Sequence, residues 1–324
     1  MLRILAAVSL AAISVIGLPA AASAQKYPDK PVRLIVPFPP GGGTDLTARI
    51  AAEYLSQKLG GSVVVENKPG AATAIGMDLV AKSPADGYTL IWTTSDGMSI
   101  LPAVKPSVPY KIPNDYEFVA GAIKYALVVG ANAKLPHKTL ADLLAWGKAN
   151  PGKLRYSSSG VGAGGHLATA LIANAAGVDM IHVPYQGAAP AVAGAAGGHV
   201  DLVLVATSSM KPHVDSGALR ALAVTDTKRS ALFPDAPTLM ESGLKDQSVV
   251  LYYGLLAPAG TPEPILATLR KEVGEMLKDP KVADRIKSMG FEPAFLPGND
   301  FKDYMIKDLE KWRGVSKAAN IRLD

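Results

Sequence analysis

The sequence predicts an α/β protein built on mostly parallel sheets with flanking helices. Short apolar runs alternate with stretches of helical periodicity along the chain. The runs are continuous rather than alternating, which is typical of strands that are buried on both faces and joined by helical crossovers. The expected strands span residues 32–38, 62–66, 88–93, 125–130, 154–158, 180–184, 201–206 and 219–224.

Helices are expected between these strands and after them. Residues 45–59 place apolar side chains on one face, and a glycine pair follows, as at many helix ends. In 139–150, Thr139 is the expected N-cap and an Asn-Pro-Gly sequence ends the helix. Two longer helical patterns, 262–289 and 299–319, carry more charge and are expected to cover the first sheet.

Two lobes are expected, because a chain of this length fits two medium domains better than one large core. The stretch 127–225 has its own alternation of strands and helices, so we interpret it as a second lobe inserted into the first. The first lobe then consists of 25–126 and 226–324, and the chain crosses between the lobes twice.

Residues 1–24 have the pattern of a secretory signal peptide. One arginine precedes the apolar run 4–18, and the sequence Ala22-Ser23-Ala24 predicts cleavage after Ala24. The apolar run is too short for a membrane-spanning helix. The mature chain is therefore expected to be exported.

The composition excludes several classes of site. The chain contains no cysteine, which removes disulfides, thiolate metal sites and cysteine nucleophiles. The formal net charge is +5, but charged residues make up only 19% of the chain and the basic ones are scattered. That distribution argues against a nucleic-acid partner.

Two glycine-rich turns each follow a predicted strand and precede a helix. The first glycine turn, 36–45, reads VPFPPGGGTD, and the second glycine turn, 157–166, reads SSSGVGAGGH. The first amides of a helix lack internal acceptors, so a bound carboxylate can satisfy them, and glycine lets the backbone approach it closely. Two such turns predict a carboxylate held from both sides of a cleft.

Other interpretations of these turns stay open. Both could be ordinary tight connections between strand and helix. The second contains GxGxxG at Gly160, Gly162 and Gly165, a dinucleotide-binding pattern, but Asp179 precedes the next strand instead of ending it. The first lacks the GK[ST] ending of a phosphate-binding loop. The nucleotide interpretations are therefore disfavoured.

The histidines and serines offer little for metal binding or catalysis. No HExxH motif or closely spaced histidine pair occurs, so no metal is expected. His166 opens the helix after the second turn and could contact a ligand or hold the turn. The GxSxG motif of many hydrolases is absent, although a hydrolase or isomerase using Ser159 and His166 remains the alternative from another class.

A third loop, 93–97, follows a strand and begins a helix. Ser95 or Asp96 could cap that helix. If the loop faces the cleft, Asp96 would instead disfavour a second anionic group there and favour an amine, a hydroxyl or a ring nitrogen. Trp92, Tyr185 and Tyr253 could contact an apolar ligand body or simply pack.

Seven segments spread along the chain carry a resemblance to a known family: YPDKPVRLIVPFPPGGGTD (27–45), VVVENKPGAATAIG (63–76), SPADGYTL (83–90), SSSGVGAGGHLA (157–168), VPYQGAAPA (183–191), PDAPTLMESG (234–243) and YYGLLAPAGTP (252–262). With these segments the sequence resembles the extracytoplasmic substrate-binding proteins of tripartite tricarboxylate transporters, also called the Bordetella uptake gene family. The similarity covers nearly the whole mature chain. Three departures concern specificity: the GAATAIG stretch lacks a second glycine pair, Gln186 replaces a frequent lysine, and Tyr252 stands where tryptophan is usual.

The resemblance implies a two-lobed periplasmic binding protein fold of the type II kind, with the ligand cleft between the lobes. It implies a periplasmic receptor, expected to be a monomer and to need no cofactor. Such a receptor captures a small organic carboxylate and delivers it to the integral-membrane permease subunits of its transporter. A sensor's soluble ligand-binding partner would use the same cleft.

The resemblance also implies the ligand-binding residues. Asp45 and His166 stand where the family places the same residue types. Backbone amides and ordered water in the two glycine turns would hold the carboxylate, and four variable loops would read the rest of the solute. The turn residues are Phe38, Pro40, Gly41, Gly42, Gly43 and Thr44, with Ser158, Ser159, Gly160, Val161 and Gly162; the loop residues are Ala72, Thr73, Thr94, Ser95, Asp96, Tyr185 and Thr207.

Overall fold

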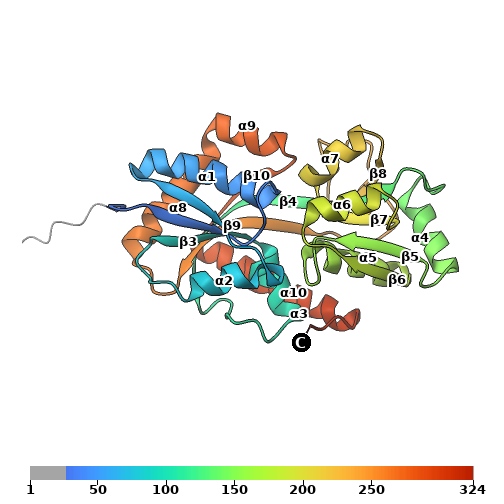
Figure 1. Cartoon of the computed structure of the whole chain (residues 1–324), viewed down its shortest axis with the longest axis horizontal. Coiled ribbons are helices and arrows are strands. Elements are labelled where there is room, and N and C mark those ends of the chain that lie inside the picture. Colours follow the sequence, from blue (N-terminus) through green and yellow to red (C-terminus); the bar gives the residue numbers. More distant parts are fainter. Residues whose placement is uncertain (1–26, 324) are drawn as a thin grey trace, which may run out of the picture.

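The computed structural model describes residues 27–323 and has two halves joined through one curled mixed sheet (Figure 1). The predicted signal peptide, 1–24, lies outside the described residues. Within the described range, no helix is long and apolar enough to cross a membrane. In the first half the strands are β1 (Val32–Val36), β2 (Val63–Asn67), β3 (Thr89–Thr94), β9 (Val250–Pro258) and β10 (Glu292–Pro297); in the second they are β5 (Leu154–Ser158), β6 (Met180–Pro184), β7 (Leu202–Ala206) and β8 (Leu219–Val224).

One long strand, β4 (Tyr116–Asn132), links the two halves. Its residues 116–126 pair with β9, and its residues 127–131 pair with β7. The strand order is β2-β1-β3-β9-β4-β7-β5-β6, with β10 and β8 also paired to β4. The two halves of the sheet therefore meet at the middle of β4, near residues 126 and 127.

The helices cover both faces of this sheet. In Figure 1, α1, α2, α8, α9 and α10 surround the first half and α4 to α7 surround the second. The bounds are α1 Gly43–Leu59, α2 Ala74–Ala81, α3 Leu101–Val104, α4 Leu140–Ala149, α5 Gly164–Ala176, α6 Ala188–Ala196, α7 Thr207–Asp215, α8 Glu263–Lys278, α9 Pro280–Ser288 and α10 Gly298–Ala318, and a π-helical turn spans Asp96–Ile100.

The predicted α/β class is confirmed, and every predicted strand is present. The β1–β2, β1–β3, β5–β6 and β5–β7 pairs are parallel, as expected, while β4 and β9 pair antiparallel with their neighbours. Two strands, β9 and β10, were not predicted. β10 contains Pro293 and Pro297, and proline removes a donor from the ladder, so its sequence does not read as a strand.

One predicted helix is two. The pattern over 262–289 breaks at Asp279 and Pro280 into α8 and α9. Proline cannot donate the helical hydrogen bond and clashes with the preceding turn. Asp279 instead caps α9, its carboxylate accepting the Lys281 amide at 2.9 Å.

Candidate functional site

A cavity of about 440 Å³ lies where the two halves meet. The first half contributes the turn from β1 to α1, the end of β3 and part of β9. The second contributes the start of α5, the loop before α6 with the start of that helix, the end of β7 and part of α7. Its lining is Phe38, Pro39, Pro40, Gly41, Gly42, Gly43, Thr44, Thr94, Asp96, Tyr125, Leu127, Ser159, Gly164, Gly165, Gln186, Gly187, Ala188, Ala189, Pro190, Leu204, Val205, Ala206, Ser208, Ser209, Pro212, His213, Leu251 and Tyr253.

The first glycine turn presents a helix N-terminus to this cavity. Helix α1 begins at Gly43 with Gly42 as its N-cap residue and has no side-chain cap. The first intrahelical bond runs from the Leu46 amide to the Gly42 carbonyl. The amides of the residues before Leu46 have no carbonyl within the helix to bond, so they can donate to an anion in the cavity.

Asp45 holds the turn from behind and does not line the cavity. Its carboxylate accepts the Gly41 amide at 2.9 Å and pairs with both nitrogens of the Arg49 fork at 3.0 Å. The Asn67 amide donates to Asp45 at 2.9 Å and to the Phe38 carbonyl at 3.0 Å. Burial raises the pKa of Asp45, but the bonds from Arg49, Gly41 and Asn67 outweigh it and keep that pKa below its usual value.

Gly43 is required by the packing around the turn. A β-carbon at this position would lie 2.7 Å from Oη of Tyr253 and 2.9 Å from Cζ of Phe291. Tyr253 is itself stacked on Tyr125, with ring centroids 4.3 Å apart. The aromatic wall of the cavity therefore lies directly against the backbone of the turn.

The second glycine turn bonds mostly to itself. The Gly160 amide donates to Ser158 Oγ at 3.3 Å, the Ala163 amide to the Gly160 carbonyl at 3.3 Å and the Gly162 amide to His166 Nδ1 at 3.1 Å. Of the predicted run 158–162, only Ser159 lines the cavity, followed by Gly164 and Gly165. Ligand binding by Ser158, Gly160, Val161 and Gly162 therefore stays a prediction that this cavity does not support.

His166 supports the second turn from inside the protein. Its ring stacks on His182 at 4.0 Å between centroids, and His182 stacks on Tyr156 at 4.8 Å. Burial lowers the pKa of His166 to about 4; burial, together with the neighbouring His166, lowers that of His182 to about 3. Both rings are therefore neutral near pH 7, and Nδ1 of His166 is free to accept the Gly162 amide.

A serine–histidine pair is present, but it is closed off. Ser158 Oγ lies 2.8 Å from His182 Nε2 and donates to the Gly160 carbonyl at 2.9 Å. Ser158 is fully buried and is not part of the cavity wall. This arrangement stabilises the turn and offers no exposed nucleophile.

Asp96 connects the two halves inside the cavity. Its Oδ1 accepts the amide of Gly164, the first residue of α5, at 2.7 Å, and its own amide donates to Thr94 Oγ1 at 3.0 Å. The side chain is 7% exposed. Burial raises the pKa of Asp96 to about 6 despite the bonds from Gly164 and Thr94.

Of the predicted loop residues, Thr94 lines the cavity with Asp96, and the others lie outside the lining. Ser95 Oγ accepts the Tyr252 amide at 3.0 Å, and Thr207 Oγ1 donates to the Gly290 carbonyl at 3.1 Å. Tyr185 packs against α6, where a β-carbon on Gly194 would meet its hydroxyl. Ala72 and Thr73 form a left-handed turn beside the Asp96 loop.

Sequence reasoning missed several cavity residues for a common reason. Tyr125, Leu127, Leu204 and Leu251 belong to strands, where an apolar side chain facing the core cannot be told from one facing a cavity. Of the aromatic candidates, Tyr253 lines the cavity, whereas Trp92 is fully buried and donates to Thr47 Oγ1 at 3.0 Å.

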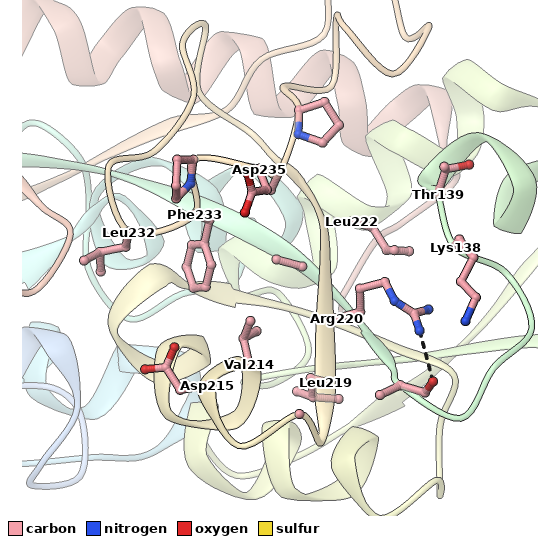
Figure 2. A pocket seen from close by; sticks show the side chains of 16 residues that line it. Lys138, Thr139, Val214, Asp215, Leu219, Arg220, Leu222, Leu232, Phe233 and Asp235 are labelled. Atoms are coloured by element: carbon pink, nitrogen blue, oxygen red, sulfur yellow. Dashed lines mark hydrogen bonds between the residues drawn. The ribbon is translucent and has the colours of Figure 1, made fainter.

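A second hollow, of about 690 Å³, lies beside β8 in the second half (Figure 2). Figure 2 shows Arg220 there, with a hydrogen bond to a backbone carbonyl. That guanidinium donates to the carbonyls of His137 and Ala133, which hold it in place. Lys138 and Thr139, the N-cap residue of α4, also line this hollow, but the Thr139 hydroxyl already accepts the Asp142 amide at 3.1 Å. The first cavity, with the uncapped N-terminus of α1, is therefore the better candidate for an anion site.

Across residues 27–323, no group of three or more His, Cys, Asp or Glu side chains is placed to hold a metal ion.

Comparisons with known proteins agree on one family. The family model described as "Tripartite tricarboxylate transporter family receptor" matches residues 47–321. Protein BugT of Bordetella pertussis is 35% identical over 324 residues, which is 100% of this chain and 99% of BugT.

Solved structures show the same fold. The periplasmic binding protein BugD is 33% identical, with a TM-score of 0.84 over 91% of this chain and 99% of BugD. R. palustris Rpa4515, solved with adipate, is 32% identical, with a TM-score of 0.87 over 91% of this chain and 99% of Rpa4515. The predicted periplasmic binding protein fold is confirmed.

Proposed function

This chain belongs to the tripartite tricarboxylate transporter family of receptors, and from that premise we propose that it binds a small organic carboxylate in the cavity between its halves. The observation that carries the proposal is the uncapped N-terminus of α1, whose residues Gly42 to Thr44 line this cavity. Rpa4515, which shares the fold, was solved with adipate, and this supports a carboxylate as the ligand class.

Backbone amides can supply the affinity without a basic side chain. A hydrogen bond to a charged group contributes about 1.5 to 3 kcal/mol. The helix end adds about 0.3 to 1 kcal/mol, and more in a partly buried site. Several such bonds correspond to micromolar binding after the cost of association is subtracted.

The two halves act as lobes in this proposal. Residues 25–126 and 226–324 form one lobe and 127–225 the other, and β4 together with the segment between β8 and β9 connects them. Closure around the carboxylate would be driven by the higher affinity of the closed form. The receptor would act in the periplasm after signal cleavage behind Ala24, as a monomer, and would deliver the solute to permease subunits without any covalent step.

The test is binding with recovery of the unchanged ligand. The mature chain is screened by thermal shift against aliphatic and aromatic mono- and dicarboxylates, and hits are measured by calorimetry and recovered for mass analysis. The expected result is stabilisation by an acid that is recovered intact. Conversion of the acid would instead favour an exported hydrolase or isomerase, and binding that persists in Gly42→Val would contradict the site.

A further inference from the structure

One carboxylate of the protein itself lies in the cavity wall. Asp96 is the sole acid among the lining residues, and no lysine or arginine lines the cavity within the described part of the chain. Its Oδ1 accepts a single amide, that of Gly164. The Thr94 side chain also bonds to this carboxylate, so both of these compensating groups are neutral. A buried carboxylate with neutral partners favours a cation or a strong donor beside it and disfavours another anion.

The position of Asp96 is fixed, so it cannot turn away from a ligand. It begins the π-helical turn after β3, and its backbone amide is held by Thr94 Oγ1. A β-carbon on Gly97 would lie 3.0 Å from the hydroxyls of Thr73 and Thr93, which shows how closely this loop is packed. The carboxylate therefore keeps its place in the wall when the solute changes.

Asp96 caps helix α5, which follows the second glycine turn, through its bond with Gly164. Gly164 is the first residue of α5, and this helix has no other side-chain cap. Asp96 thus supplies the negative charge that a helix N-terminus attracts. A second carboxylate on the ligand is not needed at the N-terminus of α5, because the Asp96 carboxylate already binds there.

We propose that Asp96 determines which acids bind: the cavity selects solutes that carry a carboxylate for the first glycine turn and an ammonium group, or another hydrogen-bond donor, for Asp96. Dicarboxylates are discriminated against. This inference rests on the proposed function, because it assumes that the carboxylate is held at the α1 N-terminus.

The test uses three acids of equal chain length: adipate, caproate and ε-aminocaproate. At the end opposite their shared carboxylate, adipate carries a second carboxylate, caproate a methyl group and ε-aminocaproate an ammonium group. We expect wild type to bind ε-aminocaproate at least about tenfold more tightly than adipate near neutral pH, a difference that one favourable charged contact would produce. In Asp96→Asn, which keeps an oxygen for the Gly164 amide, this order should disappear or reverse.

Asp308→Asn is the matched control. Asp308 is also a buried acid, but it accepts from Ser99 and from Trp312 Nε1 and does not line the cavity. This variant should keep the wild-type order. Failure of every acid to bind wild type would overturn the proposed function as well. Binding with equal affinity for adipate and ε-aminocaproate would overturn only the role of Asp96.

A measurement on wild type alone covers the case in which Asp96→Asn does not fold. Adipate can bind beside Asp96 only when the Asp96 carboxylate is protonated, so the affinity for adipate should rise by up to about tenfold per pH unit as pH falls toward 6. The affinity for ε-aminocaproate, which needs the charged carboxylate, should fall below pH 6. An adipate affinity independent of pH would overturn the inference.

The other titratable groups near Asp96 can be separated from it. Tyr110, Tyr125 and Tyr253 face it, and burial raises the pKa of each, so they stay neutral in this range. Asp308 on α10 also faces it, and His213 on α7 lines the same cavity. If the pH dependence of binding comes from Asp96, it persists in Asp308→Asn and is lost in a folded Asp96→Asn. A pH dependence that remains in Asp96→Asn would assign the titration to another group and overturn the role of Asp96.

Discussion

Nδ1 of His166 accepts the backbone N–H of Gly162 at 3.1 Å, four residues earlier in the chain. The first glycine turn contains the same relationship, because Oδ2 of Asp45 accepts the N–H of Gly41 at 2.9 Å. In each turn a side chain from the first turn of the following helix reaches back to fix the glycine loop. Both residues thus position the backbone, and neither lines the cavity.

The first prediction concerns acid. The pKa values of His166 and His182 lie below 6.5 in the folded protein, at about 4 and about 3, so the unfolded chain binds protons first as pH falls. Their contribution to stability is complete above pH 6.5 and decreases as pH falls through the folded values. The raised pKa values of Asp96 and Asp308 work in the opposite direction, whereas the lowered pKa values of Asp45 and Glu66 add to the loss in acid. We expect the Tm to drop by about 5 °C or more between pH 7 and pH 4.

Calorimetric scans of His166→Asn and of the exposed control His199→Asn check this prediction. The pH-dependent part of the Tm should shrink in His166→Asn and stay unchanged in His199→Asn. An equal slope in all three proteins would mean that the stacked histidines are not its source.

The second prediction concerns Asp45, a residue that is 2% exposed and whose carboxylate joins Gly41, Arg49 and Asn67. Asp45→Asn should lower the free energy of unfolding by about 1 to 3 kcal/mol, since a charged hydrogen-bond partner is lost. Ligand affinity should fall too, because the turn loses its support. The pKa of Asp45 is depressed, so its stabilisation is present above the ordinary aspartate range and is lost in stronger acid. Urea unfolding at neutral and acid pH should show the variant and wild type converging as pH falls.

The third prediction compares two neighbouring glycines. In Gly43→Ala the new methyl group would overlap Tyr253 and Phe291, so the free energy of unfolding should fall by about 1 to 3 kcal/mol. In Gly42→Ala nothing lies within 4 Å of the new β-carbon, and φ is −80°, so stability should change by less than about 0.5 kcal/mol. Because Gly42 lines the cavity, the affinity of the Gly42→Ala protein for the carboxylate should still fall. Unchanged affinity in a folded Gly42→Ala would argue against the anion site.

The sequence predicted the parts of the molecule whose signals are local. Continuous apolar runs indicated the buried strands. The first glycine turn lies in the cavity wall, and its binding of a carboxylate stays a prediction. The bond from Gly164 to Asp96 spans 68 residues, and the stacking of His182 on His166 joins a strand to a helix. Such partners arise from tertiary packing. The second turn shows the same limit, since its glycines were identified but the acceptors that occupy its amides could not be read from spacing.

The fourth prediction concerns the stability cost of Asp96. Its folded pKa of about 6 exceeds the ordinary value of 3.8, so its ionisation destabilises the protein as pH rises through this interval. Asp96→Asn should therefore raise the free energy of unfolding near pH 7.5 by about 1 to 3 kcal/mol. Near pH 4 the two proteins should have similar stability, because the wild-type carboxyl is then protonated. A variant less stable at both pH values would indicate that the amide cannot replace the carboxylate at Gly164.

The fifth prediction uses the strained turn before α2. Ala71, Ala72 and Thr73 have φ values of 46°, 51° and 90°, although none is glycine. A residue other than glycine in the left-handed conformation costs roughly 1 to 2 kcal/mol of stability. Replacing it by glycine removes this cost, but part of the gain is lost because glycine has greater conformational freedom in the unfolded chain. Ala72→Gly should therefore raise the free energy of unfolding by about 0.5 to 1 kcal/mol.

Ala74 is the matched control for this turn. Its φ of −58° and ψ of −33° are those of a right-handed helix. Ala74→Gly removes the same methyl group and should lower stability by about 1 kcal/mol, because glycine is a poor helix former. Urea unfolding of the two variants under one set of conditions decides the matter. If both substitutions destabilise equally, the left-handed backbone of 71–73 is not strained, and the packing of the Ala72 methyl group outweighs its dihedral angles.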